Sequence, residues 1–540
     1  MRIKLLIVFL FAVTLTFGTV GIASASETLV FAISLDVDQL DPGDTSIYQV
    51  VNNIFEGLVK FKAGTTSIEP CLATSWEIST DGKEIIFYLR KGVKFHDGTD
   101  FNADAVVFSF ARQYDLNHPY HQYGKWSFWG YMFSDIKEIK KIDAYTVRLI
   151  LKRPNVSILT SLAIHNASIV SPTNAEKYQG DAFKHPCGTG PFKFVEWVKD
   201  DHISLVTNQD YWQEIANLDQ LIFKVIPDPA ARLMALEVGE VQGMEFPNPV
   251  DFDRINNNKD LVLMTQPGMN VGYLAINTGY GYIDENKNRI RDIDLEPLVK
   301  TPGYFEPLTK KKVRQAINMA IDKQSLVDNI FMGTAIKAKN GIPPFMLGYN
   351  DDIEDYPHDP ARAKELLAEA GYPDGFEVTL HVMPVSRSYM FDPPKIAEAI
   401  QSYLAVVGIK VKFYQVDWSS YLRETGDGKH QMCLLGWTGD NGDPDNFMSV
   451  YGTNSASIGT AENRTFYIND TVQELLSKAI ITYDDEKRAV YYQEAQEIIH
   501  EDAPWVYLVH STQNVVFKNN TKGFILYPTS KVYFYPVWIE

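Results

Sequence analysis

The chain has 540 residues, which is more than a single hydrophobic core accommodates, so two or more domains are expected. Hydrophobic residues make up 45% of the chain and charged residues 22%, the proportions of an ordinary soluble globular protein. The formal net charge of −18 argues against nucleic acid and against anionic membrane surfaces as partners.

The first residues have the pattern of a secretory signal peptide. Two basic residues, Arg2 and Lys4, precede an apolar run over 5–17, and an A-x-A sequence of small residues ends at Ala25. We therefore predict a signal peptide over 1–25, rather than an N-terminal membrane anchor. Since no later apolar run approaches the roughly 20 residues of a membrane span, the mature protein is expected to be soluble, outside the cytoplasm and not membrane-inserted.

The cysteine content gives no sign of a disulfide framework. Cys71, Cys187 and Cys433 are far apart and form no C-x-x-C pair. An odd number of cysteines in an exported chain leaves at least one thiol unpaired, and the spacing does not match a zinc ribbon. Buried free thiols are the expected state.

The region from residue 27 to about 267 is mixed and rich in strands. Ile85–Leu89, Thr146–Leu151 and Leu221–Ile226 are apolar runs bounded by turn residues, which predicts strands. Asn102 is a suitable N-cap for a helix over Ala103–Tyr114, whose first turn carries an aspartate.

From about residue 310 to 501, helices and strands are expected to alternate. Thr309 is predicted to cap a helix, and Asp359 followed by proline is predicted to open another that ends before Gly371. Further helices and strands follow, and the predicted strands are Phe376–Val382, Ile409–Val416 and Met432–Leu435. This alternation indicates α/β layering.

Two connections join these regions, one near 267–270 and one near 509–512. The tail after them returns to the strand-rich, aromatic composition of the N-terminal region. We therefore predict lobe I over 26–268 plus 512–540 and lobe II over 269–511, with an inserted surface loop at about 279–307. Two crossings of the chain make a hinge that permits closure of one lobe on the other.

Motifs of catalysis are not found in the sequence. There is no G-x-S-x-G, and no glycine–lysine pair is followed by the serine or threonine of a phosphate-binding loop. A secreted hydrolase is therefore the least favoured class. Asp284 begins a spacing like that of a calcium loop, but Arg289 and Leu295 replace its glycine and glutamate, so calcium there stays an open question.

The stretch GWTGDNGDPDNF, over 436–447, places Asp440, Asp443 and Asp445 close together between glycines. Its register does not fit a calcium loop, and aspartates in such a string commonly build turns. Asp440 stands apart because it follows directly after a predicted buried strand. In α/β sheets, ligands bind outside the carboxyl ends of the strands. We therefore assign Asp440 to a ligand and the other two aspartates to the turn.

Arg387 follows the predicted strand Phe376–Val382 in the same way. Two neighbouring strand ends could present a carboxylate and a guanidinium to one cleft, and a zwitterion would satisfy both. Trp437 could provide an amphipathic wall. The alternative is a direct Arg387–Asp440 salt bridge with no ligand.

Several longer stretches resemble one known family. EPCLATSWEISTDGKEIIFYLRKGVKFHDGTDFNADAVVFSF (69–110), GTGPFKFVEW (188–197), VRQAINMAIDK (313–323) and DPARAKELLAEAG (359–371) resemble the peptide-binding class of the bacterial extracellular solute-binding proteins, family 5. The resemblance covers nearly the whole mature chain. It implies an α/β, two-lobed fold of the type II-like periplasmic binding proteins, with an extra strand-rich subdomain in the first lobe.

Within this family the chain most resembles members that bind dipeptides. The resemblance implies that Asp440 holds the peptide amine, that Arg387 holds the carboxylate, and that Trp437, Tyr389, Thr45 and Ser46 complete the site. It also implies a periplasmic, monomeric substrate-binding component that delivers its ligand to inner-membrane ABC permease subunits. No enzymatic activity, cofactor or resident metal ion is expected.

Other ligands remain open for the same fold: longer peptides, haem, glutathione or a nickel chelate. A charge clamp at both ends of the cleft argues against longer peptides. The chain also departs from its relatives, because the disulfide cysteines of the dipeptide-binding members have no counterparts and the 279–307 insertion is not part of their pattern.

Overall fold

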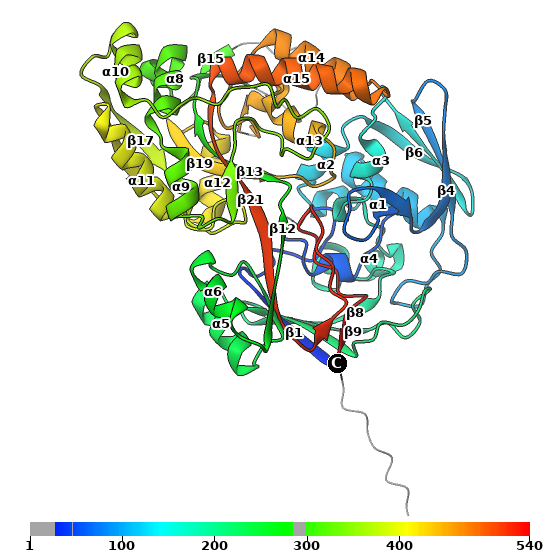
Figure 1. Cartoon of the computed structure of the whole chain (residues 1–540). Helices are drawn as coiled ribbons and strands as arrows, with labels where there is room; N and C mark the ends of the chain where they lie inside the picture. The colour runs from blue at the N-terminus through cyan, green and yellow to red at the C-terminus, as the bar shows by residue number, and fades with distance from the viewer. Residues whose placement is uncertain (1–26, 46, 284–297, 460) are drawn as a thin grey trace, which may run out of the picture.

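A computed structural model describes residues 27–45, 47–283, 298–459 and 461–540. The predicted signal peptide, Ser46 and the calcium-like spacing at 284–295 lie outside these ranges. The molecule has two lobes, and one long strand, β21 (Trp505–Lys518), runs through both of them (Figure 1). The predicted two-lobed α/β architecture is confirmed.

The main sheet is shared by both lobes. It has twelve strands, in the order β18-β17-β19-β13-β21-β11-β1-β10-β9-β8, with β12 and β16 also paired to β21. Their bounds are β1 Thr28–Ile33, β8 Phe192–Val198, β9 His202–Thr207, β10 Gln220–Val225, β11 Gly243–Glu245, β12 Leu261–Pro267, β13 Asn270–Ile276, β16 Ala335–Lys337, β17 Phe376–His381, β18 Ile409–Tyr414 and β19 Met432–Thr438.

The crossing between the lobes is visible in the pairing of β21. Its first residues pair with β13, where Ala275 lies opposite Trp505, and its last residues pair with β11 and β12. β12 and β13 are joined by a short turn at 268–269 (Figure 1). The boundaries predicted for the lobes fall at this turn and at the change of partners within β21, and they stay a prediction.

The first lobe carries the strand-rich subdomain expected from the sequence. It is a four-stranded antiparallel sheet, β4-β5-β7-β6, covered by helix α1 (Ala103–Tyr114). The Asn102 side chain accepts hydrogen bonds from the backbone N–H groups of Asp104 and Ala105, so the predicted N-cap is confirmed. The strands are β4 Ala73–Ile78, β5 Glu84–Leu89, β6 Ile136–Asp143 and β7 Thr146–Leu151.

Shorter elements complete the first lobe and the returning tail. The helices are α2 Ser127–Met132, α3 Ile158–Ser161, α4 Pro172–Tyr178, α5 Pro229–Val238 and α6 Phe252–Asn256. The short strands are β2 Val59–Phe61, β3 Ile68–Pro70, β22 Thr521–Lys522 and β23 Trp538–Ile539. The last two pair with each other in the tail, which packs into the core of the first lobe through Phe524 and Phe534.

The second lobe is rich in helices, of which α11 packs against β18. The helices are α7 Glu306–Thr309, α8 Lys311–Ala320, α9 Lys323–Asn329, α10 Pro360–Glu369, α11 Pro393–Val406, α12 Trp418–Gly426, α13 Asp445–Met448, α14 Asp470–Ile480 and α15 Asp485–Asp502. Asp359 caps α10 as predicted. The prediction that Thr309 caps α8 is wrong, because Thr309 ends the short helix α7 and its hydroxyl donates to the Glu306 carbonyl.

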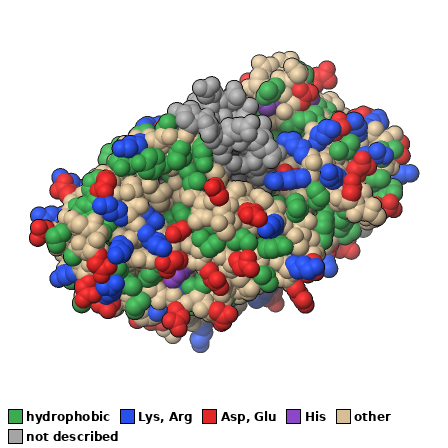
Figure 2. Space-filling view, turned by 90° about the horizontal axis from the view of Figure 1, so that it is seen from above, with side chains coloured by type: hydrophobic (Ala, Val, Ile, Leu, Met, Phe, Trp, Pro, Cys, Tyr) green, Lys and Arg blue, Asp and Glu red, His purple; other side chains and the backbone are tan. Residues whose placement is uncertain are grey.

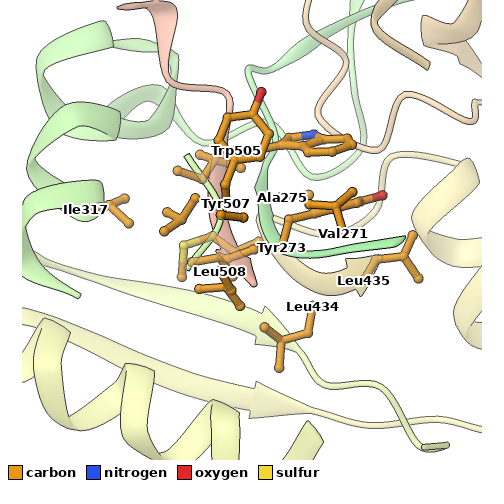
Figure 3. Close-up of a cluster of buried hydrophobic side chains, with 14 of the residues drawn as sticks. Val271, Tyr273, Ala275, Ile317, Leu434, Leu435, Trp505, Tyr507 and Leu508 are labelled. Atoms are coloured by element: carbon orange, nitrogen blue, oxygen red, sulfur yellow. The ribbon is translucent and has the colours of Figure 1, made fainter. Parts of the chain in front are cut away.

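The core of the second lobe forms around the strands that cross between the lobes. The rings of Tyr273 on β13 and Trp505 on β21 stack with their centroids 3.5 Å apart, and both side chains are buried (Figure 3). Leu434 on β19 and Ile317 on α8 belong to the same cluster (Figure 3). The edge of the main sheet that carries the candidate site is therefore held by a continuous hydrophobic core.

The base of the predicted insertion is a small sheet rather than an irregular loop. β14 (Tyr280–Ile283) pairs antiparallel with β15 (Leu298–Lys300) and parallel with β20 (Ser457–Ile458).

All three cysteines are buried and free. On the face shown in Figure 2, charged side chains of both signs are interspersed. Within the described ranges, no helix combines the length and the apolar character needed to cross a bilayer.

Candidate functional site

The two charged residues predicted to bind a ligand follow neighbouring parallel strands. β17 and β19 run parallel, with Leu380 opposite Met432 and His381 opposite Cys433. Their carboxyl ends therefore meet at one edge of the sheet, where Arg387 and Asp440 follow them. The predicted placement of these residues at adjacent strand ends agrees with the structure.

Asp440 is half-buried and is oriented by Asn446, six residues further along the same turn. The Asn446 side-chain oxygen accepts hydrogen bonds from the Asp440 backbone N–H at 3.1 Å and from the Trp437 indole N–H at 2.9 Å. The Asn446 amide also donates to the Asp440 carboxylate at 3.4 Å. A single amide thus fixes the carboxylate and the tryptophan relative to each other. The sequence interpretation did not identify this role of Asn446.

The other two aspartates of the turn have structural partners. Arg488 on α15 donates to both carboxylate oxygens of Asp443, at 2.8 and 2.5 Å, and both side chains are buried. Asp443 in turn accepts the backbone N–H of Asp445 at 2.9 Å. A bidentate guanidinium–carboxylate pair has little freedom to rotate. It therefore anchors the turn that presents Asp440.

Arg387 begins a tight turn that ends at Met390, with reciprocal backbone hydrogen bonds of 3.0 Å between the two residues. Its guanidinium lies over the ring of Trp418 at the start of α12, 5.1 Å from the ring centroid. Stacking on an aromatic face holds the planar group in place and leaves its N–H donors available. Arg387 is itself half-buried.

Tyr389 packs against two glycines that lie opposite each other, Gly272 on β13 and Gly436 on β19. A Cβ at Gly436 would lie 2.1 Å from the Tyr389 ring, and a Cβ at Gly272 would lie 2.4 Å from the Tyr389 carbonyl oxygen. The absence of both side chains therefore lets the 387–390 turn approach the sheet closely. Tyr389 is buried, with a relative exposure of 7%.

No direct salt bridge joins Arg387 and Asp440. Among the residues that the structure describes, neither has an oppositely charged side chain within 4.0 Å. The alternative of a structural ion pair is thus not what the structure contains. Two half-buried charges without a counter-ion are costly unless a ligand or water provides the compensating group.

Tyr48 of the first lobe lines a cavity together with Asp440. Burial raises the pKa of the Tyr48 hydroxyl, the carboxylate of Asp440 raises it further, and Arg387 opposes these effects. The ionisation of the Tyr48 hydroxyl is therefore affected by the charges of both residues of the second lobe. His165 packs against Tyr48 with ring centroids 5.4 Å apart, and burial lowers the pKa of His165 to about 4, so this ring is neutral.

A cavity lies between Asp440 and the first lobe. Its lining residues are Tyr48, Asn52, Phe61, Ala163, Ile164, His165, Asp440, Thr529 and Lys531. Both the early part of the chain and the returning tail therefore contribute to the wall opposite Asp440. The sequence interpretation missed Tyr48 and Lys531 because no local motif marks them.

The lobes also touch beside the acidic turn. The Asn441 amide donates to the Ser161 hydroxyl on α3 at 2.9 Å, and the backbone N–H of Val156 donates to the Ile480 carbonyl at 3.0 Å. A second, small cavity lies here; its lining residues are Met132, Ser134, Asp135, Asn155, Ser157, Ser161, Asn441, Asp445, Asn446 and Ser449. The turn that carries Asp440 thus contacts the first lobe directly.

Of the first-lobe residues predicted to contact the ligand, only Thr45 is described. It is fully buried, its hydroxyl donates to Asp38 at 2.8 Å, and its carbonyl oxygen lies 3.2 Å from His165 Nε2. Its side chain is thus engaged within the first lobe. A ligand contact by Thr45 stays a prediction, and Ser46 lies outside the described residues.

The ionisation of Asp440 responds to its surroundings. Burial raises its pKa to about 7, against a smaller lowering by the hydrogen bond from Asn446. Near neutral pH the carboxyl group therefore exchanges readily between its protonated and ionised forms. An ammonium ion placed beside it would favour the ionised form.

Within the described ranges, there is no group of three or more histidine, cysteine, aspartate or glutamate side chains arranged to hold a metal ion. The candidate site combines one carboxylate, one guanidinium and aromatic side chains.

Comparison with known proteins gives a consistent result. The model of the bacterial extracellular solute-binding proteins, family 5 (Middle), matches residues 67–458. The dipeptide-binding protein of Escherichia coli K12 is 38% identical over 502 residues, covering 90% of this chain and 89% of that protein. Heme-binding protein A of Haemophilus influenzae is 37% identical over 511 residues, covering 92% and 88%.

A solved structure is similar along nearly its whole length. It is the ABC transporter-associated periplasmic binding protein DppA from Helicobacter pylori, in complex with the peptide STSA. The TM-score is 0.84 at 36% identity, covering 95% of this chain and 98% of that one. The two lobes and the cleft between them thus define the class of periplasmic binding proteins. Within that class, the chain belongs to the bacterial extracellular solute-binding proteins, family 5.

Proposed function

We propose that this protein is the substrate-binding component of an ABC importer and that its ligand is a dipeptide. The observation that carries the proposal is the pair of charged side chains, Asp440 and Arg387. They follow adjacent parallel strands and, among the described residues, have no oppositely charged side chain within 4.0 Å. A dipeptide carries an ammonium and a carboxylate at its two ends. It would neutralise both charges at once.

In the proposed complex, the amine binds Asp440 and the carboxylate binds Arg387. Asn446 holds Asp440, and the ring of Trp418 holds Arg387. Each charge-assisted hydrogen bond contributes about 1.5–3 kcal/mol. Because the two charges meet only the two ends of the ligand, the side chains between them can be accommodated with the help of water.

Closure would follow from the two crossings of the chain. We assign lobe I to 26–268 plus 512–540 and lobe II to 269–511, with the hinge at the β12–β13 turn and within β21. A ligand that binds both lobes favours the closed form by its differential affinity. The closed, loaded protein would then deliver the dipeptide to inner-membrane permease subunits, as a periplasmic monomer without enzymatic activity.

One second ligand class has a specific observation in its favour. The similar structure from Helicobacter pylori contains the peptide STSA, which is longer than a dipeptide. In the proposed complex Arg387 binds the carboxylate of the second residue, so a longer peptide would leave Arg387 without a carboxylate unless the peptide folded back. The proposal therefore ranks dipeptides above longer peptides.

Calorimetry with a ligand series tests this proposal. Ala-Leu, Ala-Leu-Ala, Ala-Leu-Ala-Ala and haem are titrated separately into the purified mature protein. The proposal predicts that Ala-Leu binds most tightly. Tighter binding of haem or of the tetrapeptide would contradict it. Mass spectrometry of the protein under native conditions, as purified from cells, would identify any co-purified ligand independently.

A further inference from the structure

Lys531 is a half-buried lysine in the wall of the cavity that also contains Asp440. It comes from the returning tail of the chain and lies above the rings of Tyr533 and Tyr527, 5.0 and 5.9 Å from their centroids. No carboxylate among the described residues lies within 4.0 Å of its ammonium group. The lysine therefore has aromatic support but no counter-ion.

The acidic side chain that acts on Lys531 from within the protein is already occupied. Glu56 accepts hydrogen bonds from Thr189 at 2.7 Å and from Tyr211 and Trp212 at 2.8 Å each. Burial also raises the pKa of Glu56, which favours its neutral form. Glu56 is thus a satisfied core group rather than a partner for the ammonium.

Lys531 and its neighbour Thr529 form a polar part of the cavity wall. Burial lowers its pKa to about 8, which shows that its charged form is held at a cost. Thr529, two residues earlier in the same wall, is 7% exposed, and its hydroxyl oxygen is buried without a hydrogen-bond partner. A cation and an unpartnered hydroxyl in one cavity wall form a site suited to a carboxylate.

The position of Asp440 decides which part of a ligand would reach this wall. If the peptide amine lies on Asp440, as in the proposed function on which this inference rests, the first side chain starts one bond away from that amine. It then enters the cavity that Asp440 and Lys531 share. The second side chain starts nearer to the carboxylate end, at Arg387, which does not line this cavity.

We propose that Lys531, assisted by Thr529, makes the cavity a selective site for an acidic side chain at the first position of the peptide. The Glu or Asp carboxylate would accept hydrogen bonds from the lysine ammonium. The same interaction would offset the repulsion between that carboxylate and Asp440. Other cavity residues, such as Phe61 and Ile164, would contact the methylene groups.

Calorimetric titration of isosteric peptide pairs tests this inference. Glu-Leu and Gln-Leu differ only in the charge of the first side chain, and Leu-Glu and Leu-Gln carry the same difference at the second position. In the unmodified protein, we expect Glu-Leu to bind about ten- to a hundredfold more tightly than Gln-Leu. The Leu-Glu and Leu-Gln pair should not show this preference.

The preference for Glu-Leu over Gln-Leu should depend on Lys531. In Lys531→Met, and separately in Lys531→Gln, we expect Glu-Leu to lose its advantage, while Gln-Leu keeps its affinity within a few-fold. Lys62→Met is the matched control, because Lys62 is an exposed lysine of the same lobe and its loss changes the net charge equally. This control should retain the preference for Glu-Leu.

The outcomes separate this inference from the proposed function. If none of the four peptides binds to the unmodified protein, the proposed function fails and the inference fails with it. If all bind but Glu-Leu has no advantage over Gln-Leu, only the inference is overturned. A preference that persists in both Lys531 variants would also overturn the role of this residue.

Discussion

Asp440 and Asp443 lie in the same turn, yet their surroundings differ completely. Asp443 is buried against Arg488 with both carboxylate oxygens paired, whereas Asp440 is oriented by an amide and has no cation within 4.0 Å among the described residues. The arginines differ in the same way, since Arg488 is paired with a carboxylate and Arg387 stacks on the Trp418 ring. A charge with its counter-ion in place contributes to the fold, and a charge oriented but left unpaired is available to a ligand.

The largest effect is expected from breaking the structural pair. Asp443→Asn leaves the Arg488 guanidinium buried without its counter-ion, which costs about 3–5 kcal/mol in the free energy of unfolding. Urea denaturation followed by circular dichroism measures this loss. A variant as stable as the unmodified protein would show that Asp443 does not anchor the turn.

The matched substitution at Asp440 should lower the affinity for a dipeptide without lowering the stability of the apo protein. Asp440→Asn keeps the shape of the side chain and removes the charge that meets the amine, so the affinity for a dipeptide should fall by about 2–5 kcal/mol. The stability of the apo protein at neutral pH should not fall, because a carboxylate that is costly to bury is replaced by a neutral amide. Calorimetry and urea denaturation on the same preparation measure the two quantities.

Gly436→Ala tests how the ligand-facing turn is seated. The added Cβ would lie 2.1 Å from the Tyr389 ring, so the 387–390 turn must shift away from the sheet. Overpacking of this kind costs about 1–3 kcal/mol. We expect a lower free energy of unfolding together with weaker dipeptide binding, because Arg387 moves with the turn.

The smallest effect concerns pH. The pKa of Asp440 is raised from 3.8 to about 7, so the folded apo protein binds more protons than the unfolded chain between these values, and this group makes stability decline as pH rises through that window. Dipeptide affinity has the opposite dependence, because the amine needs the ionised carboxylate. Affinity should fall by up to about tenfold per pH unit below 7, as measured by calorimetry at several pH values. An Asp440→Asn variant should lose this dependence.

Local patterns in the sequence predicted much of the fold. The cap at Asn102 and the strand ends before Arg387 and Asp440 depend on a few neighbouring residues and on the rule for parallel strands, so they could be inferred. The prediction that Thr309 caps α8 was wrong, because the Thr309 hydroxyl donates to the Glu306 carbonyl within the short helix α7 that precedes α8.

Contacts between distant parts of the chain could not be inferred in this way. Tyr48 and Lys531 lie near opposite ends of the sequence, and only the folding of the tail onto the first lobe brings them to one cavity. Asn446 was visible in the turn, but its role depends on the path of the backbone around Asp440. Such residues have no characteristic spacing that a sequence pattern can reveal.

The central claim is that Asp440 binds the free amine of a peptide. Titration of Ala-Leu and N-acetyl-Ala-Leu into the unmodified protein tests this most directly, because acetylation removes the ammonium and leaves the carboxylate. The account predicts that acetylation abolishes most of the binding and that Asp440→Asn narrows the difference between the two peptides. Equal affinities of the free and acetylated peptides for the unmodified protein would contradict it.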